Sequence, residues 1–160
     1  MEYSFKTIDE INPITQEFVA DYSKLITQLR GIETIITIAE VQEIQRRVDS
    51  ELLVCAFSES NRVIGIVQGT YICTPPMYMV YVNAVVVDES TRGGGLGSRL
   101  MVELEERIKR KWSLTVKIQL TSRPNRGTRT FYERLGYIAR VPENQNETTV
   151  FVKKLIDGTH

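Results

Sequence analysis

The stretch that decides the fold is Val85-Val86-Val87-Asp88-Glu89-Ser90-Thr91-Arg92-Gly93-Gly94-Gly95-Leu96-Gly97-Ser98. A β-branched run ends at polar residues, four glycines follow within five positions, and an amphipathic pattern then begins. This order predicts a strand, a tight loop and a helix N-terminus. Glycine lets the backbone approach a ligand closely. The free N–H groups of a helix's first turn, at the positive end of its dipole, form an anion site. We therefore expect a phosphate-bearing ligand here.

The length and composition are those of an ordinary globular domain. The 160 residues are 42% hydrophobic and 25% charged, so we expect one domain over residues 1–160. Twenty basic and twenty acidic side chains cancel, which gives no indication of a nucleic-acid surface. Because the sequence shows neither a secretory signal nor an apolar run long enough to span a bilayer, we expect a cytoplasmic protein without a membrane partner.

Two cysteines, Cys55 and Cys73, fall in expected strands. We interpret them as buried free thiols in a reducing compartment. Two cysteines and the single histidine, His160, cannot build a recognisable zinc site, so no metal is expected.

Hydrophobic periodicity predicts a mixed α/β (α+β) sheet with two helix layers. The predicted strands are 3–8, 52–57, 63–72, 77–87, 114–120, 137–139 and 150–155, and the predicted helices are 15–29, 38–48, one from 96 onward and 126–135. In the clearest helix, Leu96, Leu100, Leu104 and Ile108 recur every four residues. Its outer side is expected to carry the i,i+4 pairs Glu103–Arg107, Glu105–Lys109 and Glu106–Arg110. Thr74-Pro75-Pro76 should break the sheet, because proline cannot donate to a ladder.

Two common phosphate-binding motifs do not fit the glycine loop. A P-loop needs a lysine and a hydroxyl residue after its last glycine, and residues 93–99 contain no lysine. A Rossmann fingerprint needs an acidic residue at the end of the next strand, and residues 113–122 contain none.

A third motif fits. Arg92-Gly93-Gly94-Gly95-Leu96-Gly97 matches Arg/Gln-x-x-Gly-x-Gly/Ala, the pyrophosphate loop of the GNAT superfamily of acetyl-CoA-dependent acyltransferases. Residues 125–137 resemble the second signature of that family, an asparagine seven residues before a tyrosine in a Tyr-x-x-Leu-Gly-aromatic run. Thr128 stands where the family often has alanine. The resemblance implies a central mixed, mostly antiparallel sheet of six to seven strands with about four helices.

The resemblance also implies a site for acetyl-CoA as co-substrate. The main chain of the strand before the loop would pair with the pantetheine arm, the loop would bind the pyrophosphate, and the later helix would reach the nucleotide end. The residues implied are Val85, Val86, Val87, Arg92, Gly93, Gly94, Gly95, Leu96, Gly97, Ser98, Asn125, Arg126, Thr128, Arg129 and Tyr132. For Arg126 and Arg129 a role as solvated surface arginines stays open.

The same resemblance implies a hydrogen bond from Tyr132 to the departing thiolate, although Tyr132 is also interpretable as a core aromatic. An acceptor amine has a pKa near 10 and must lose a proton before it attacks. His160, at the end of the chain, is assigned to a tail. Asn83 and Tyr81, which alternate with Val85 and so would share its face, are the candidates to hold a water as base. Asp88 and Glu89 are interpreted as solvated acids at the strand end.

Three functional hypotheses follow. The favoured one is an N-acetyltransferase that moves the acetyl group directly to an amine acceptor, a small molecule or a protein. The second is a non-catalytic acyl-CoA-binding domain on the same scaffold, and the third a nucleotide-binding α/β protein. The two amino-terminal helices, the loop around Gly31 and residues 141–149 would contact the acceptor, with Glu143 and Glu147 hinting at a cationic amine. We expect a monomer or a homodimer that pairs through an exposed final strand.

Overall fold

The computed structural model describes residues 2–123, 127–140 and 148–155, and its elements follow the predicted order. The strands are β1 (Ser4–Thr7), β2 (Glu51–Phe57), β3 (Val63–Thr74), β4 (Met77–Val87), β5 (Lys117–Ser122), β6 (Ile138–Arg140) and β7 (Thr149–Lys154). The helices are α1 (Gln16–Arg30), α2 (Ile38–Arg46), α3 (Leu96–Lys111) and α4 (Arg129–Arg134), with 3-10 turns η1 (Ile8–Glu10) and η2 (Glu89–Thr91).

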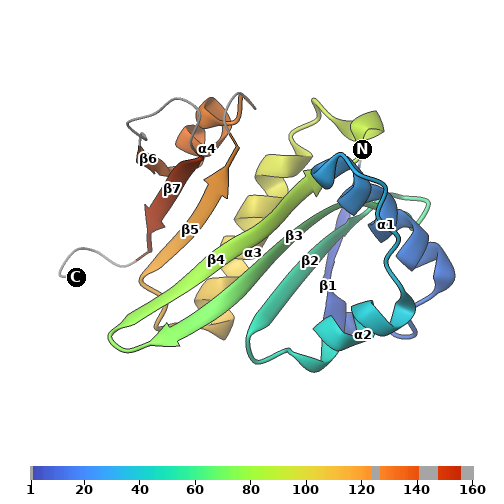
Figure 1. Ribbon diagram of the computed structural model, residues 1–160, viewed down its shortest axis with the longest axis horizontal. Coiled ribbons are helices and arrows are strands. Elements are labelled where there is room, and N and C mark those ends of the chain that lie inside the picture. The colour runs from blue at the N-terminus through green and yellow to red at the C-terminus, as the bar shows by residue number, and fades with distance from the viewer. Residues whose placement is uncertain (1, 124–126, 141–147, 156–160) are drawn as a thin grey trace.

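The strands form one mixed sheet in the order β1-β2-β3-β4-β5-β7-β6. Only β4 and β5 pair in parallel among these described strands. Helices α1 and α2 lie on one face and α3 on the other (Figure 1). This architecture confirms the predicted fold class. The final strand is not exposed as expected, because β7 lies between β5 and β6.

Each face of the sheet carries its own hydrophobic core. On one face, Leu100, Leu104 and Ile108 of α3 pack against the sheet, as their four-residue spacing predicts. On the other, Phe18 and Leu25 of α1 pack with residues of α2, β2 and β3. Burial of both faces therefore fixes the sheet between two helix layers.

Glu105 of α3 differs from its predicted place on the outer side of the helix. Its side chain is buried, at 6% exposure. Its carboxylate accepts hydrogen bonds from the Tyr137 hydroxyl and the Lys153 ammonium, both at 2.9 Å. A buried carboxylate needs such partners, and they come from elements that the helix pattern cannot reveal. Glu103–Arg107 does form the predicted ion pair, at 3.5 Å.

The two prolines after Thr74 form the turn of a hairpin. Thr74 pairs directly with Met77, so β3 and β4 continue to the turn, where a missing N–H breaks no ladder. Cys55 is a buried free thiol as predicted, whereas Cys73 is exposed, because it lies near the tip of this hairpin.

A bulge in β4 changes which side of the strand faces which core. Gln68 pairs with Ala84 and Gly69 with Val82, which leaves Asn83 as an extra residue. Val80 and Val82 belong to the core under α3, and Ala84 and Val86 to the core under α1. Val85 packs against the α3 core, so Tyr81 and Asn83 do not share its face. The prediction that they do is wrong because one inserted residue shifts the two-residue alternation.

Strands β4 and β5 separate halfway along β4. Their pairing runs from Met79–Lys117 to Val82–Leu120 and then stops, although β4 continues to Val87. In Figure 1 the two strands diverge from this point toward α4 and the end of α1. The sheet therefore contains an opening, with main-chain groups of β4 unpaired along it.

Candidate active site

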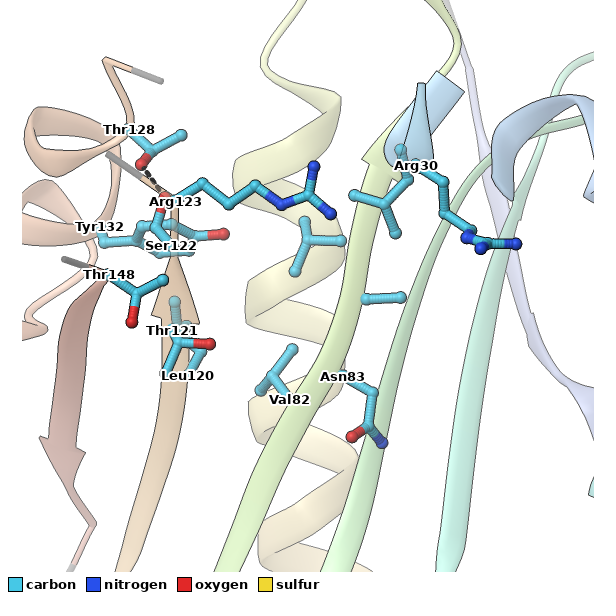
Figure 2. A pocket seen from close by; sticks show the side chains of 13 residues that line it. Arg30, Val82, Asn83, Leu120, Thr121, Ser122, Arg123, Thr128, Tyr132 and Thr148 are labelled. Atoms are coloured by element: carbon cyan, nitrogen blue, oxygen red, sulfur yellow. Dashed lines mark hydrogen bonds between the residues drawn. The ribbon is translucent and has the colours of Figure 1, made fainter. Parts of the chain in front are cut away.

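Two cavities occupy the opening and meet inside it. One, of about 430 Å³, lies between the diverging strands, and Figure 2 shows it with α3 behind. The other, of about 480 Å³, extends along Val85, Val86 and Val87 to the glycine loop. Leu29, Val85, Thr128 and Tyr132 line both. A molecule in one cavity is therefore adjacent to a molecule in the other.

The loop after β4 is held by a buried turn. Asp88, predicted as a solvated acid, is instead 8% exposed, because its carboxylate accepts from Ser90 N (2.9 Å) and pairs with Lys24 (3.2 Å). Gly93 and Gly95 then adopt positive φ values of 90° and 77°, a region that favours glycine. These contacts fix where α3 begins.

The first turn of α3 presents free N–H groups to the second cavity. Gly95 is the N-cap and offers no side-chain acceptor. The first intrahelical bond runs from Arg99 N to Gly95 O (3.2 Å), so the N–H groups of residues 96–98 have no helical partner. The first turn carries no acidic side chain, and Arg92 also lines this cavity. The arrangement suits an anion.

Gly97 brings α3 close to α4. A Cβ atom there would lie 3.3 Å from a ring carbon of Phe131, which is tighter than ordinary contact. Because glycine has no side chain, the first turn of α3 can lie this close to the Phe131 ring of α4. Arg92, Gly93, Gly95, Leu96, Gly97 and Ser98 all line this cavity, whereas Gly94 does not.

Tyr132 of α4 lies where the two cavities meet. Its ring packs against Phe131 (4.9 Å between centroids) and Phe151 (5.0 Å), and its side chain points toward the opening (Figure 2). Burial raises the pKa of Tyr132 to about 12, because a phenolate would be desolvated. The hydroxyl is therefore a hydrogen-bond donor at neutral pH. Tyr132 is a core aromatic and a cavity residue at once.

Thr128 ties α4 to the end of β5. Its hydroxyl and that of Ser122 lie 2.6 Å apart. The helix begins at Arg129, three residues later than predicted. Arg129 pairs with Glu133 (2.6 Å) and lines neither cavity.

Of the two residues proposed to hold a water as base, the structure brings one to the opening. Asn83 lines the first cavity. Tyr81 does not line it and instead shares a hydrogen bond with Thr121 (2.9 Å) across the β4–β5 pair. Asn125, Arg126, Glu143, Glu147 and His160 lie outside the described residues.

The end of α1 supplies cavity residues that the sequence did not single out individually. Gln28, Leu29 and Arg30 line one or both cavities. The side-chain oxygen of Gln28 is buried and has no hydrogen-bond partner among the described residues. In the sequence, Gly31 marks the end of this helix. In the structure, its positive φ of 71° ends α1 at this point.

Within the described part of the chain, the charged side chains that line the first cavity are two arginines. Arg123 extends from the end of β5 toward β4. Arg30 lies on the opposite wall of the cavity, and its side chain points away from the cavity (Figure 2). The described residues contain no group of three His, Cys, Asp or Glu side chains that could hold a metal ion. No helix within the described ranges is long and apolar enough to cross a membrane.

Solved structures with the same fold are numerous. The chain resembles an acetyltransferase from Trypanosoma brucei (TM-score 0.70, 21% identity, 89% of this chain and 97% of the other). It also resembles an aminoglycoside 6'-N-acetyltransferase complexed with coenzyme A (0.73, 17%, 100% of each chain) and a chain of the NatC complex bound to Gag peptide and CoA (0.74, 16%, 98% and 100%). At these identities the likeness shows the fold alone.

The family is shown by sequence. No curated protein matches the chain significantly. A family model described as an acetyltransferase (GNAT) domain matches residues 18–154, which include β4, the glycine loop, α3 and Tyr132. The chain therefore belongs to the GNAT family of acetyltransferases.

Proposed function

We propose that this protein transfers the acetyl group of acetyl-CoA directly to an amine in a ternary complex. The observation that carries the proposal is the meeting of the two cavities at Tyr132 and Val85. One cavity ends at an anion site, and the other opens between the diverging strands. A donor and an acceptor bound in them would have their reacting groups side by side.

The cavity at the glycine loop would bind the acyl-CoA. The N–H groups at the start of α3, with Arg92, would bind the pyrophosphate. The unpaired edge of β4 at Val85 and Val87 would pair with the pantetheine amides as another strand would. The aminoglycoside 6'-N-acetyltransferase and the NatC complex, both crystallised with coenzyme A, support this ligand.

The chemistry needs little from side chains. The amine nitrogen forms a bond to the thioester carbon, the C–S bond breaks, and the nitrogen's surplus proton passes to solvent. A backbone N–H on the unpaired edge of β4 would donate to the developing oxyanion. Tyr132 would donate a hydrogen bond to the departing thiolate. With a pKa of about 12 against about 8.5 for a thiol, complete proton transfer is uphill by roughly 5 kcal/mol, so the phenol stabilises the thiolate without giving up its proton.

One observation favours a second candidate, a domain that binds acyl-CoA without turnover. The described residues that line the two cavities include no carboxylate and no histidine, so no side-chain base stands at the opening. If the protein does transfer the acetyl group, the acceptor amine would lose its proton to water, and Asn83 would be the polar group beside it.

The first experiment measures the melting temperature with acetyl-CoA, CoA, ATP or NAD. A ligand at a hundred times its Kd adds about 2.7 kcal/mol of stability. We expect acetyl-CoA and CoA alone to raise the melting temperature. A shift with only ATP or NAD would overturn the acyl-CoA site.

Turnover separates the two candidates. Thiol release would be followed with four probe amines: spermidine, lysine, kanamycin and a glycine-initiated tetrapeptide. For the amine acetylated fastest, Tyr132→Phe should lower kcat about 10–100-fold, because one donor to the developing charge is lost, with little change in CoA affinity. Binding of CoA without release of thiol beyond the amine-free rate would favour the non-catalytic domain.

A further inference from the structure

A polar strip crosses the sheet face beneath the opening, on the side of α1 and α2. Glu51 begins β2, Thr70 pairs with it on β3, and Asn83 is the bulged residue of β4. The Thr70 hydroxyl lies 3.0 Å from each oxygen of the Glu51 carboxylate. The Asn83 side-chain nitrogen lies 2.6 Å from the same hydroxyl oxygen. Three strands therefore contribute to one hydrogen-bonded chain.

The direction of every bond in this chain follows from its carboxylate end. An ionised carboxylate only accepts, so the Thr70 hydroxyl donates its one hydrogen to Glu51. The hydroxyl oxygen then has only lone pairs to offer Asn83, which must present its NH2 group. The Asn83 carbonyl oxygen is consequently turned away from Thr70. In Figure 2 this oxygen is on the side of the opening, and among the described residues Asn83 makes no other hydrogen bond.

We propose that Glu51, acting through the Thr70 hydroxyl, holds the Asn83 carbonyl oxygen toward the opening, where it accepts an N–H of the acceptor amine. This inference rests on the proposed acetyl transfer. A neutral primary amine that donates one N–H to Asn83 keeps its lone pair for the thioester carbon. Glu51 and Thr70 are positioning residues, since neither touches the amine.

The bulge is what makes this arrangement available. In a strand without a bulge, the residue after Val82 would pair with one residue of β3. As an extra residue, Asn83 reaches Thr70 with its nitrogen while its side chain still lines the first cavity. Gln68 adds a longer contact to Glu51 (3.4 Å), which keeps the carboxylate on this strip.

The hydrogen-bond geometry is testable by NMR without any ligand. The Asn83 side-chain amide signals are identified by their loss in Asn83→Ala. Thr70→Val, which removes the hydroxyl at nearly constant shape, should shift these signals and speed their exchange with water, whereas Thr70→Ser should preserve them. Unchanged Asn83 signals in Thr70→Val would overturn the proposed orientation.

Kinetics then test the role of the orientation. With the probe amine that the wild type acetylates fastest, Thr70→Val should raise the KM for the amine about tenfold, which corresponds to about 1.4 kcal/mol. Glu51→Leu should raise it as well, and Thr70→Ser should restore it to within about threefold. The KM for acetyl-CoA should stay within about twofold, because its cavity is untouched. Thr115→Val, which removes a buried hydroxyl before the start of β5, at the end of that strand away from the opening, should lower stability without changing either KM.

The outcomes separate this inference from the proposed function. Turnover with an unchanged amine KM in Thr70→Val, or an equal rise in both KM values, would defeat the positioning role alone. CoA binding without turnover of any probe amine would defeat the proposed transfer, and the inference with it.

Discussion

At the scale of single residues, several polar groups around the opening have no hydrogen-bond partner among the described residues. The Gln28 oxygen is buried beside the glycine loop without a hydrogen bond among the described residues. An unsatisfied buried acceptor destabilises the free protein by about 1–3 kcal/mol. A small rotation of the side chain would let this oxygen accept from a bound ligand, such as an amide N–H of the proposed pantetheine arm. Gln28 is therefore expected to weaken the free protein and to strengthen the complex.

Gln28→Leu tests this balance. The variant should unfold at the same or a higher temperature than the wild type when free, because the orphaned oxygen is gone. Its stabilisation by CoA should fall, with a Kd raised about 3–10-fold for one lost hydrogen bond. Calorimetric titration with CoA and thermal unfolding without it measure the two effects. A free protein that is less stable with unchanged CoA affinity would assign Gln28 to packing only.

Gly95→Ala separates backbone strain from ligand binding. At a φ of 77°, a Cβ atom meets nothing within 4 Å, so the substitution strains the backbone by about 1–2 kcal/mol without a clash. Gly31→Ala is the matched control, with a φ of 71° and an equally open surrounding. Both variants should lose similar stability in urea unfolding, and only Gly95→Ala should weaken CoA binding. Equal CoA affinity in both would remove the start of α3 from the binding site.

At the scale of elements, α3 joins the two parts of the sheet on either side of the opening. Its leucines pack under β2, β3 and β4, and its Glu105 bonds to Tyr137 after α4 and to Lys153 on β7. Lys153 also donates to the Leu135 carbonyl (2.7 Å). One buried carboxylate therefore holds the wall that carries Tyr132 against α3, the helix whose first turn lines the second cavity.

Glu105→Ala should release that wall. The variant leaves the buried Tyr137 hydroxyl without its acceptor and the half-buried Lys153 ammonium with only the Leu135 carbonyl, which costs about 1–3 kcal/mol of unfolding free energy. Glu106→Ala is the control on the same helix, because Glu106 makes only an exposed pair with Lys109 (3.8 Å) and should cost less than about 1 kcal/mol. Urea unfolding measures both. Equal losses would show that the Glu105 contacts contribute no more than a surface pair.

At the scale of the whole molecule, buried tyrosines set the alkaline limit of stability. Burial raises the pKa of Tyr22 and Tyr132 to about 12, and that of Tyr137 is raised by burial and by the Glu105 carboxylate. In the unfolded chain all three phenols titrate near 10. The folded state holds their protons more tightly, so their contribution is complete below pH 10 and is lost as the pH rises from 10 to 12.

We expect the contribution of these phenols to the unfolding free energy to stay constant up to about pH 9.5. Above that pH the unfolding free energy should fall steeply. Tyr22 and Tyr132 would each account for roughly 2 kcal/mol of the fall by pH 12. Urea unfolding at a series of pH values measures it, with tyrosinate absorbance as a second signal. Titration of all tyrosines near pH 10 in a still folded protein would contradict the burial of these rings.

The parts of the fold that depend on local patterns could be predicted from the sequence. The spacing of Leu100, Leu104 and Ile108 predicted α3, and the glycine loop predicted where that helix begins, because both are set by residues close along the chain. The bulge at Asn83 could not be predicted from β4, since that strand contains neither glycine nor proline; the one local signal is Gly69 on β3, which lies opposite the bulge. The inward turn of Glu105 depends on partners 32 and 48 residues away, which helix periodicity does not encode.

The parallel pairing of β4 with β5 also has a consequence for the order in which the molecule is built. During synthesis, β1 to β4 and α1 to α3 are made first, and in the complete protein they form the antiparallel part of the sheet with helices on both faces. The second wall of the opening, with Tyr132, arrives only after β5 has crossed over beneath α3 to lie beside β4. Parallel pairs form slowly because a long crossover must close first. We therefore expect the antiparallel part of the sheet to fold first and the pairing of β5 with β4, which completes the opening, to form last.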